Sequence, residues 1–341
     1  MPTTRQVLLK SRPHGPAGLD NFDMREAELP ALADDDVAVR AIYMSLDPYM
    51  RGRLDAEKSY AANFEVGAPM IARCVGEVTE SLNPKFQAGE VVVGMMDWAD
   101  HSVVAGGKGI AKVDADLAPL PYFLGLLGMP GLTAWVGMRE IGQPKEGETL
   151  YVSAASGAVG QLAGQMGKIA GCKVMGCAGT DAKLAYVTEE LGFDAVFNHR
   201  TDTDYLAAMQ RICPDGIDVN FENVGGAMLE AALEHANNYA RFIQCGAISQ
   251  YNLVGDQRYG VKNLEHLHRK RVRMQGFIVT DHWHLMREFQ VEVAGWLKAG
   301  QIKYKIDITE GLENATQAFL GLLEGENFGK KVIKIGPETV S

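Results

Sequence analysis

Short apolar runs alternate with longer segments of mixed polarity over residues 148–280. The apolar runs predict strands at 149–153, 173–177, 195–198, 218–222, 241–245 and 272–279. The mixed segments predict helices at 158–170, 182–191, 203–213, 226–236 and 284–299. Because strands that alternate with helices form parallel βαβ units, we predict an α/β domain with a doubly wound parallel sheet of the Rossmann type.

Residues 1–120 show a different pattern, in which strand-like runs follow one another with glycine and proline between them. The clearest runs lie at 7–9, 36–43, 75–78 and 90–94. Within the second run, alternate residues share one face, and these are Val37, Val39, Ala41 and Tyr43. We therefore predict a compact, partly open β-barrel for this part of the chain.

Two further segments complete the pattern. Residues 122–141 change character and predict a helical segment, and the apolar run 332–335 predicts a last strand that returns to the first domain. A chain of 341 residues is too long for one ordinary hydrophobic core, so we predict two domains.

A turn of small residues follows the predicted strand at 149–153. Compared with the pattern G-x-G-x-x-G, it has Ala155 at the first glycine and retains Gly157 and Gly160. Small residues let the backbone approach a pyrophosphate at the start of a helix, and Gly160 is expected to let that helix pack closely on the sheet. A tight turn without a ligand has the same pattern, but the strand, helix and second strand around it favour a nicotinamide or flavin dinucleotide.

The end of the second strand distinguishes NAD from NADP. An acidic residue there would bind the ribose 2′-hydroxyl, but positions 176–180 contain none. Thr180 and Lys183 are suited to a 2′-phosphate, one as a hydroxyl donor and the other as a positive charge. Asp181 is expected to cap the helix that begins near Ala182. NADP is therefore the preferred cofactor, with a solvated helix lysine as the alternative interpretation of Lys183.

Composition narrows the class of protein. The chain is 47% hydrophobic and 22% charged, with a net charge of −10, which is typical of a globular domain and unfavourable for binding nucleic acid or anionic membranes. It has no apolar run of the roughly 20 residues that a membrane span needs. No signal peptide is visible, so we expect a cytoplasmic protein.

The cysteines and histidines predict no metal site. Five scattered cysteines, Cys74, Cys172, Cys177, Cys213 and Cys245, form no Cys-x-x-Cys pair and are expected to be buried, reduced thiols. The histidine pairs at 266 and 268 and at 282 and 284 have no cysteine nearby.

Seven segments in the same order carry a family resemblance over essentially the whole chain. They are 45–53, 128–134, 154–160, 222–226, 245–252, 276–279 and 327–330. With them the chain resembles the zinc-independent, NADPH-dependent alkenal/one (double-bond) reductases of the medium-chain dehydrogenase/reductase superfamily. That group includes leukotriene B4 12-hydroxydehydrogenase/prostaglandin reductase, the plant double-bond reductases and bacterial curcumin reductase.

The resemblance implies a domain organisation and excludes zinc. It implies a GroES-like β-barrel substrate domain at 1–122 with 310–341, a Rossmann NADP-binding domain at 123–309, and a homodimer. Zinc-dependent relatives have a Gly-His-Glu where this chain has Gly67-Ala68-Pro69, and a lobe of four cysteines where this chain has none between Cys74 and Cys172. Without zinc as a Lewis acid, alcohol oxidation is not expected as the main activity.

The resemblance also implies a reaction. Family members reduce a carbon–carbon double bond conjugated to a carbonyl, by transfer of a hydride from NADPH to the β-carbon and of a proton to the α-carbon. Tyr251 matches the family tyrosine that hydrogen-bonds the carbonyl, with packing against the cofactor as the alternative role. Tyr49 is expected to line the substrate pocket, with a core position as its alternative, and Tyr259 is a weaker candidate.

Cofactor contacts carry over position by position. The residues that the resemblance places against NADP(H) are Ala154, Ala155, Ser156, Gly157, Ala158, Val159, Gly160, Gly179, Lys183, His199, Asn223, Cys245, Gly246, Ala247, Ile248, Ser249, Tyr251, Phe277, Ile278, Val279 and Asn327. One departure concerns the 2′-phosphate. Relatives often have Phe-Asn-Tyr-Lys where this chain has Phe197-Asn198-His199-Arg200.

Other functions remain open at this point. A quinone reductase or a non-catalytic NADP-binding protein would share the same fold and cofactor site. A short-chain dehydrogenase is excluded, because none of the eleven tyrosines is followed four residues later by lysine. Enals, enones, oxo-lipids and curcuminoids are all compatible substrates, and the loop 254–263 is expected to cap the pocket.

Overall fold

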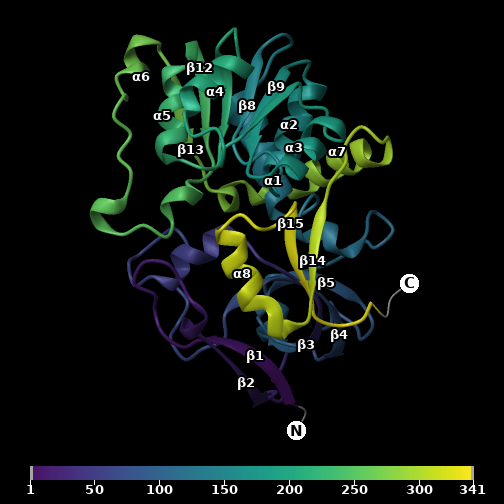
Figure 1. Ribbon diagram of the computed structural model, residues 1–341. Coiled ribbons are helices and arrows are strands. Elements are labelled where there is room, and N and C mark those ends of the chain that lie inside the picture. The colour runs from purple at the N-terminus through teal and green to yellow at the C-terminus, as the bar shows by residue number, and fades with distance from the viewer. Residues whose placement is uncertain (1–2, 339–341) are drawn as a thin grey trace. The chain divides into compact units, whose positions relative to one another are not determined.

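The computed structural model describes residues 3–338, and the chain forms two compact units (Figure 1). The first unit combines residues up to Gly125 with residues from Ile306 onward, and the second spans Leu126–Lys305.

The second unit contains a six-stranded sheet in which every neighbouring pair is parallel. Its strands are β8 (Thr149–Val152), β9 (Lys173–Ala178), β10 (Ala195–Asn198), β11 (Ile217–Glu222), β12 (Ala236–Gln244) and β13 (Arg273–Gly276). Their order across the sheet is β10-β9-β8-β11-β12-β13, which reverses direction between β8 and β11. The predicted Rossmann fold is therefore confirmed.

Helices cover both faces of this sheet because alternate strand residues point to opposite sides. Tyr151 and Met175 pack in one apolar cluster with Met209 and Met228 of the helices on that side. The helices of the unit are α1 (Met129–Val136), α2 (Gly160–Ile169), α3 (Asp181–Glu189), α4 (Tyr205–Ile212), α5 (Gly226–Glu234), α6 (His266–Arg269) and α7 (Met286–Lys298).

The largest differences between the predicted and observed elements of the second unit concern three segments. The helical segment expected at 122–141 is broken into a 3₁₀ turn (Leu120–Leu124), α1 and a π-helical turn (Gly137–Gly142), and Pro130 marks the start of α1 because its ring fits the first helical turn. β12 already begins at Ala236, where the preceding helix was expected to end. β13 ends at Gly276, and a 3₁₀ segment (Val279–Leu285) follows.

The first unit is barrel-like and built from two sheets. β1 (Thr3–Leu9) pairs with β2 (Phe22–Glu28), and a larger sheet runs in the order β14-β15-β3-β4-β5-β7 with β6 also on β3. The strands of the larger sheet are β3 (Val37–Ser45), β4 (Ile71–Ser81), β5 (Val91–Asp97), β6 (His101–Val104), β7 (Ile110–Lys112), β14 (Ile306–Glu310) and β15 (Lys330–Lys334). The helix α8 (Ala315–Leu323) connects β14 to β15 (Figure 1).

The chain returns to its beginning through β15, which pairs antiparallel with β3 and brings Val332 opposite Ser45. β3 is buried on both faces and not only on the face of Val37 and Val39, because the 3₁₀ turn Leu120–Leu124 packs on it as well. Within the described residues, no helix combines the length and the apolar character that a membrane crossing demands.

Candidate active site

The loops that follow the six parallel strands lie at the carboxyl edge of the sheet, where open α/β sheets bind their ligands. Every predicted cofactor residue of the second unit except Lys183 lies in or at the end of one of these loops, and Lys183 is the third residue of α3, the helix that follows β9. The turn 154–160 follows β8, Gly179 follows β9, His199 follows β10, Asn223 follows β11, the stretch 245–251 follows β12, and the stretch 277–279 follows β13.

The turn after β8 has the geometry of a backbone cradle. Ala154 adopts a left-handed conformation with φ of 51°, and its carbonyl accepts a hydrogen bond from the N–H of Gly157 at 2.9 Å. The N–H of Ala155 donates to the carbonyl of Cys177 at 2.9 Å, which ties the turn to β9. The hydroxyl of Tyr304 donates to the carbonyl of Ala158 at 2.9 Å. The turn is therefore fixed in shape and leads directly into α2.

Gly160 is required for a different reason from the one expected. A Cβ at this position would lie 2.5 Å from the carbonyl oxygen of Ala154, so the turn itself excludes a side chain there. Close packing of α2 on the sheet instead depends on Gly167, whose Cβ would lie 2.4 Å from Leu150 and 2.9 Å from Val174. The expectation that Gly160 governs helix–sheet packing was wrong, because Gly160 lies at the first residue of α2, over the turn and not over the strands.

Three basic side chains gather at the ends of β9 and β10. Lys183 is only 7% exposed, so it is not a solvated helix lysine. His199 lies next to Gly179, where an added Cβ would be 3.0 Å from its Nε2 atom and 3.2 Å from Nε of Arg200. Burial lowers the pKa of His199 below its ordinary value, and the charges of Arg200 and Lys183 lower it further. This basic cluster (Lys183, His199 and Arg200) suits an anionic group.

The helix that carries Lys183 is capped by Thr180 and not by Asp181 as expected. The Thr180 hydroxyl oxygen accepts a hydrogen bond from the N–H of Lys183 at 3.3 Å, while Asp181 is the first helical residue and accepts from the side chain of Asn198 at 3.0 Å. Thr180 takes the cap because its extended backbone precedes the helix, whereas Asp181 already lies in the first turn. No described residue accepts a hydrogen bond from the Thr180 hydroxyl, so its proton is available to a ligand.

Tyr251 lies in the loop after β12. Its hydroxyl oxygen accepts a hydrogen bond from the N–H of Ala247 at 3.3 Å, and burial raises the pKa of the phenol. No described residue accepts a hydrogen bond from this hydroxyl, so its proton is available to a ligand. Tyr259 differs, because its hydroxyl donates to the Glu230 carboxylate at 3.0 Å. The structure therefore favours Tyr251 over Tyr259 as a hydrogen-bond donor.

Tyr49 lies in the first unit, in the 3₁₀ segment Pro48–Leu54. Its ring packs against the core of that unit, and burial raises the pKa of its hydroxyl. The segment is anchored by a buried ion pair of 2.6 Å between Lys330 Nζ and Asp47 Oδ1, and Lys330 also donates to the carbonyl of Leu46 at 2.8 Å. Burial lowers the pKa of Lys330, opposed by the Asp47 charge. Tyr49 is thus both part of the core and held in a fixed position.

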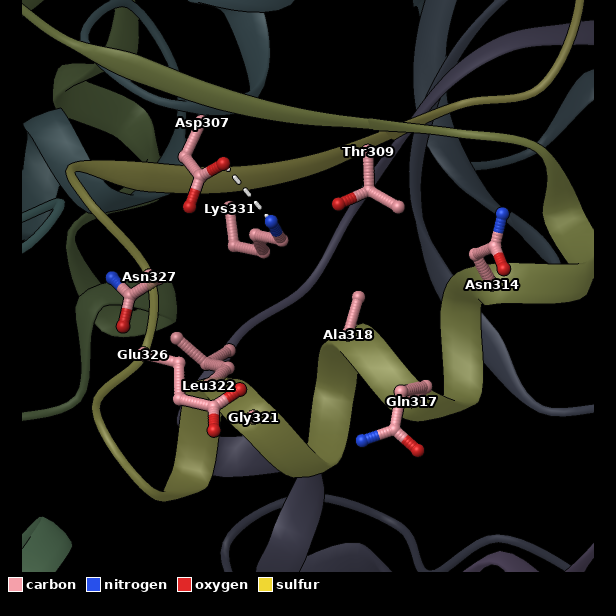
Figure 2. A pocket seen from close by; sticks show the side chains of 10 residues that line it. All are labelled: Asp307, Thr309, Asn314, Gln317, Ala318, Gly321, Leu322, Glu326, Asn327 and Lys331. Atoms are coloured by element: carbon pink, nitrogen blue, oxygen red, sulfur yellow. Dashed lines mark hydrogen bonds and ion pairs between the residues drawn. The ribbon is translucent and has the colours of Figure 1, made fainter.

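Asn327 lies between α8 and β15, beside a hollow of about 460 Å³ in the first unit (Figure 2). Its side-chain amide donates to the carbonyl of Gly329 at 2.7 Å, which fixes the orientation of the amide group. Polar and apolar surface line the hollow about equally, and an ion pair of 2.9 Å between Asp307 and Lys331 lies on one side of it (Figure 2). Asn327 can therefore present its amide oxygen, while one of its two N–H groups is already used.

Phe277, Ile278 and Val279 leave the end of β13 as three half-buried apolar residues. Phe277 packs edge-on against the ring of His282 at a centroid distance of 6.3 Å. Asn223, at the end of β11, donates from its side chain to the carbonyl of Ser153 at 2.8 Å, so it joins the loops after β8 and β11.

Sequence reasoning missed two residues that the structure places under these loops. Ser153 accepts a hydrogen bond from the N–H of Asn223 at 2.8 Å, and Glu222 is completely buried at the end of β11. Glu222 belongs to one of the seven family-like segments, and a carboxylate at the end of an apolar strand is the signal that could have identified it.

The cysteines are free thiols, and four of the five are buried. Burial raises the pKa of Cys245, which lies in the loop with Tyr251, to about 12. Among residues 3–338, no three or more His, Cys, Asp and Glu side chains are grouped so that they could hold a metal ion.

Comparison with known proteins gives two family models, an N-terminal domain of oxidoreductase at residues 5–113 and a zinc-binding dehydrogenase at residues 158–294. The chain is 44% identical to an NADPH-dependent curcumin reductase of Escherichia coli, over 97% of this chain and 96% of that protein. It is 43% identical to a 2-alkenal reductase (NADP(+)-dependent) of Nicotiana tabacum, over 98% of each. The chain belongs to the zinc-independent enone reductases of the medium-chain dehydrogenase/reductase superfamily.

A solved member of this reductase family has the same fold. The crystal structure of CurA from Vibrio vulnificus in complex with NADPH is 40% identical, covers 98% of this chain and 100% of that chain, and superimposes with a TM-score of 0.92. The family resemblance predicted from the sequence is therefore confirmed over both units.

Proposed function

We propose that this protein uses NADPH to reduce the carbon–carbon double bond of α,β-unsaturated aldehydes and ketones. The observation that carries the proposal is the half-buried Tyr251, whose hydroxyl proton no described residue accepts, at the carboxyl edge of a Rossmann sheet. Relatives that are NADPH-dependent curcumin and 2-alkenal reductases align with 97% and 98% of the chain, which supports the same reaction class here.

Residues of the second unit fit NADP(H). The backbone cradle 154–160 would hold the pyrophosphate, because a Cβ at Gly160 would fill the turn. The basic cluster, with Gly179 and Thr180, would hold the 2′-phosphate. Asn223 and the stretches 245–251 and 277–279 would border the ribose and the nicotinamide. Asn327 of the first unit stays a prediction from the family resemblance.

NADPH, when bound, supplies the hydride for the β-carbon of the substrate. Tyr251 donates a hydrogen bond to the carbonyl oxygen, where negative charge develops as the double bond is reduced. Because burial raises its pKa, the phenol remains a protonated donor throughout the physiological pH range. Tyr49 of the first unit stays a predicted substrate-binding residue, and the Asp47–Lys330 ion pair anchors the segment that carries it.

We place the protein in the cytoplasm as a homodimer with a small-molecule substrate and no nucleic-acid or membrane partner. Free thiols support a reducing compartment. β13 is the last strand of the sheet, and three of its four residues are exposed, which supports pairing with a second copy. Light scattering on the purified protein tests the dimer, and a monomer at micromolar concentration would contradict it.

Oxidation of NADPH tests the reaction. We expect turnover with 3-nonen-2-one, measured as the loss of NADPH absorbance, and a saturated ketone as the product. Turnover with a quinone alone would assign a quinone reductase. Binding of NADPH without turnover of either compound would favour a non-catalytic role.

The basic cluster predicts a pH dependence of NADP+ binding. Without a ligand, the lowered pKa keeps His199 neutral at pH 7. A phosphate dianion beside it favours the imidazolium and raises that pKa, so binding takes up a proton. The affinity for NADP+ is therefore full below the pKa of His199 in the free enzyme, and this gain is lost as pH rises through the pKa of His199 in the complex. The total loss in affinity is about tenfold for each pKa unit that separates the two values. Titration calorimetry from pH 6.5 to 8.5 measures the Kd of NADP+ as a function of pH.

The matched control for this dependence is His199→Tyr, which places the aromatic residue of the relatives at this position. Its NADP+ affinity is expected to change little over the same pH range, and NAD+ binding is expected to be flat in both proteins. Equal pH dependence in the wild type and the variant would show that His199 does not take up the proton.

A further inference from the structure

Glu222 is a buried carboxylate whose partners are all neutral. It has no exposed surface, and burial raises the pKa of its carboxyl group. Its Oε1 atom accepts hydrogen bonds from the N–H groups of Val224 and Gly225, both at 2.7 Å, and from the hydroxyl of Ser153 at 3.2 Å. Its Oε2 atom accepts from the side chain of Asn220 at 3.1 Å. A carboxylate without a cation is costly to bury, so its four donors indicate a specific role.

These contacts join two strands where the sheet reverses direction. Ser153 directly follows β8, and Glu222 ends β11, which is the neighbour of β8 in the sheet. Asn223 completes the link, because its backbone N–H donates to the Ser153 hydroxyl at 2.8 Å and its side chain donates to the Ser153 carbonyl at 2.8 Å. A dinucleotide crosses an open α/β sheet at this reversal.

The same residues support the loop that carries Tyr251. The backbone carbonyl of Glu222 accepts hydrogen bonds from Cys245 at 2.9 Å and Gly246 at 3.1 Å. Gly225 has φ of 73°, a conformation that only glycine adopts readily, and this turns its N–H toward the carboxylate. A Cβ on Gly225 would lie 2.9 Å from Ala247, so the turn and the loop are closely packed. Moving the turn would therefore move the Tyr251 loop.

The turn and the basic cluster serve different ends of the cofactor. Lys183 and His199 follow β9 and β10, on one side of β8, whereas Glu222 lies on the other side. Strands are about 4.8 Å apart, so the turn lies about 10 Å from the end of β9.

We propose that Glu222 is a positioning residue that fixes the turn 223–226 and the loop 245–251 for the nicotinamide half of the dinucleotide. The inference rests on the proposed NADP(H) site. Glu222 acts through Ser153, Asn223 and the backbone of 224–225, while the basic cluster binds the 2′-phosphate.

The test compares Glu222→Ala with the isosteric Glu222→Gln. In Glu222→Gln, the side-chain oxygen can still accept hydrogen bonds from the N–H groups of Val224 and Gly225. Asn220 Oδ1 has no hydrogen-bond partner among the described residues. When the Asn220 amide rotates, this oxygen can accept a hydrogen bond from the amide of the new glutamine. Titration calorimetry measures the Kd of NADP+ and of adenosine 2′,5′-bisphosphate, which lacks the nicotinamide half. In Glu222→Ala we expect the NADP+ Kd to rise about tenfold and that of the bisphosphate to change less than about twofold. Glu222→Gln is expected to remain within about threefold of wild type for both.

Each other outcome overturns the inference. If Glu222→Ala raises the Kd of NADP+ and of the bisphosphate equally, the substitution loosens the whole site. If neither Kd changes, the hydrogen bonds of Glu222 do not position the site. If Glu222→Gln binds NADP+ as weakly as Glu222→Ala, the negative charge of Glu222 is required and its hydrogen bonds alone are not sufficient. If Glu222→Ala does not fold, Ser153→Ala replaces it. That variant must raise the Kd of NADP+ about threefold and leave the Kd of the bisphosphate nearly unchanged. A wild-type protein that binds neither ligand would instead overturn the proposed function itself.

Discussion

Replacing Tyr251 with phenylalanine is expected to lower the kcat for an enone by about 100- to 1000-fold, the usual effect of losing a donor to a developing oxyanion. The change removes only the hydroxyl, whose proton no described residue accepts and whose oxygen accepts from the N–H of Ala247 at 3.3 Å. The phenyl ring keeps its packing, so the Kd of NADP+ should change less than about threefold. Steady-state kinetics and titration calorimetry measure the two quantities.

Tyr259→Phe is the matched control. Its hydroxyl donates to Glu230, so removing it is expected to change kcat by less than about twofold. If Tyr251→Phe retains wild-type turnover, the hydroxyl has no part in the reaction. A loss of NADP+ binding together with turnover would assign Tyr251 to cofactor packing, the alternative role considered from the sequence.

Replacing Lys183 with alanine is expected to weaken NADP+ binding by about 10- to 150-fold, because a hydrogen bond to a charged group contributes about 1.5–3 kcal/mol. The side chain is 7% exposed and lies close enough to His199 to lower the pKa of that ring. NAD+ lacks the 2′-phosphate, so its Kd is expected to stay nearly unchanged. The ratio of the two Kd values therefore measures the contribution of Lys183.

Lys173→Ala controls for a general loss of positive charge. Lys173 begins β9 at the opposite edge of the sheet, where its exposed side chain pairs with Asp215 at 2.8 Å. Surface pairs of this kind contribute little, and the variant is expected to bind both cofactors as the wild type does. Equal weakening of NADP+ and NAD+ by Lys183→Ala would remove Lys183 from 2′-phosphate recognition.

The sheet of the second unit could be predicted because each strand is a short apolar run separated from the next by a helix. The predicted strand 195–198 matches β10, and 149–153 exceeds β8 by one residue. Seven family-like segments in order then pointed to the reductase family. These features depend on local pattern, which a single sequence contains.

The remaining features depend on where the backbone lies in three dimensions. Thr180 and Asp181 are both good caps by residue type, and only the extended backbone of Thr180 decides between them. Gly160 and Gly167 look alike in sequence, but one faces the Ala154 carbonyl and the other faces Leu150. The sequence shows Glu222 at the end of an apolar strand, but only the structure shows that its carboxyl group is completely buried.

The pairing of β15 with β3 has a consequence for synthesis of the chain. β3 is made early, but its partner residues 332–334 are made near the end, after the whole second unit. Long-range pairing of this kind is slow, whereas a unit contained within Leu126–Lys305 can fold as soon as it emerges from the ribosome. A nascent chain arrested before Lys330 would therefore carry a folded second unit and an incomplete first unit, with residues 43–45 of β3 open to pairing with another chain.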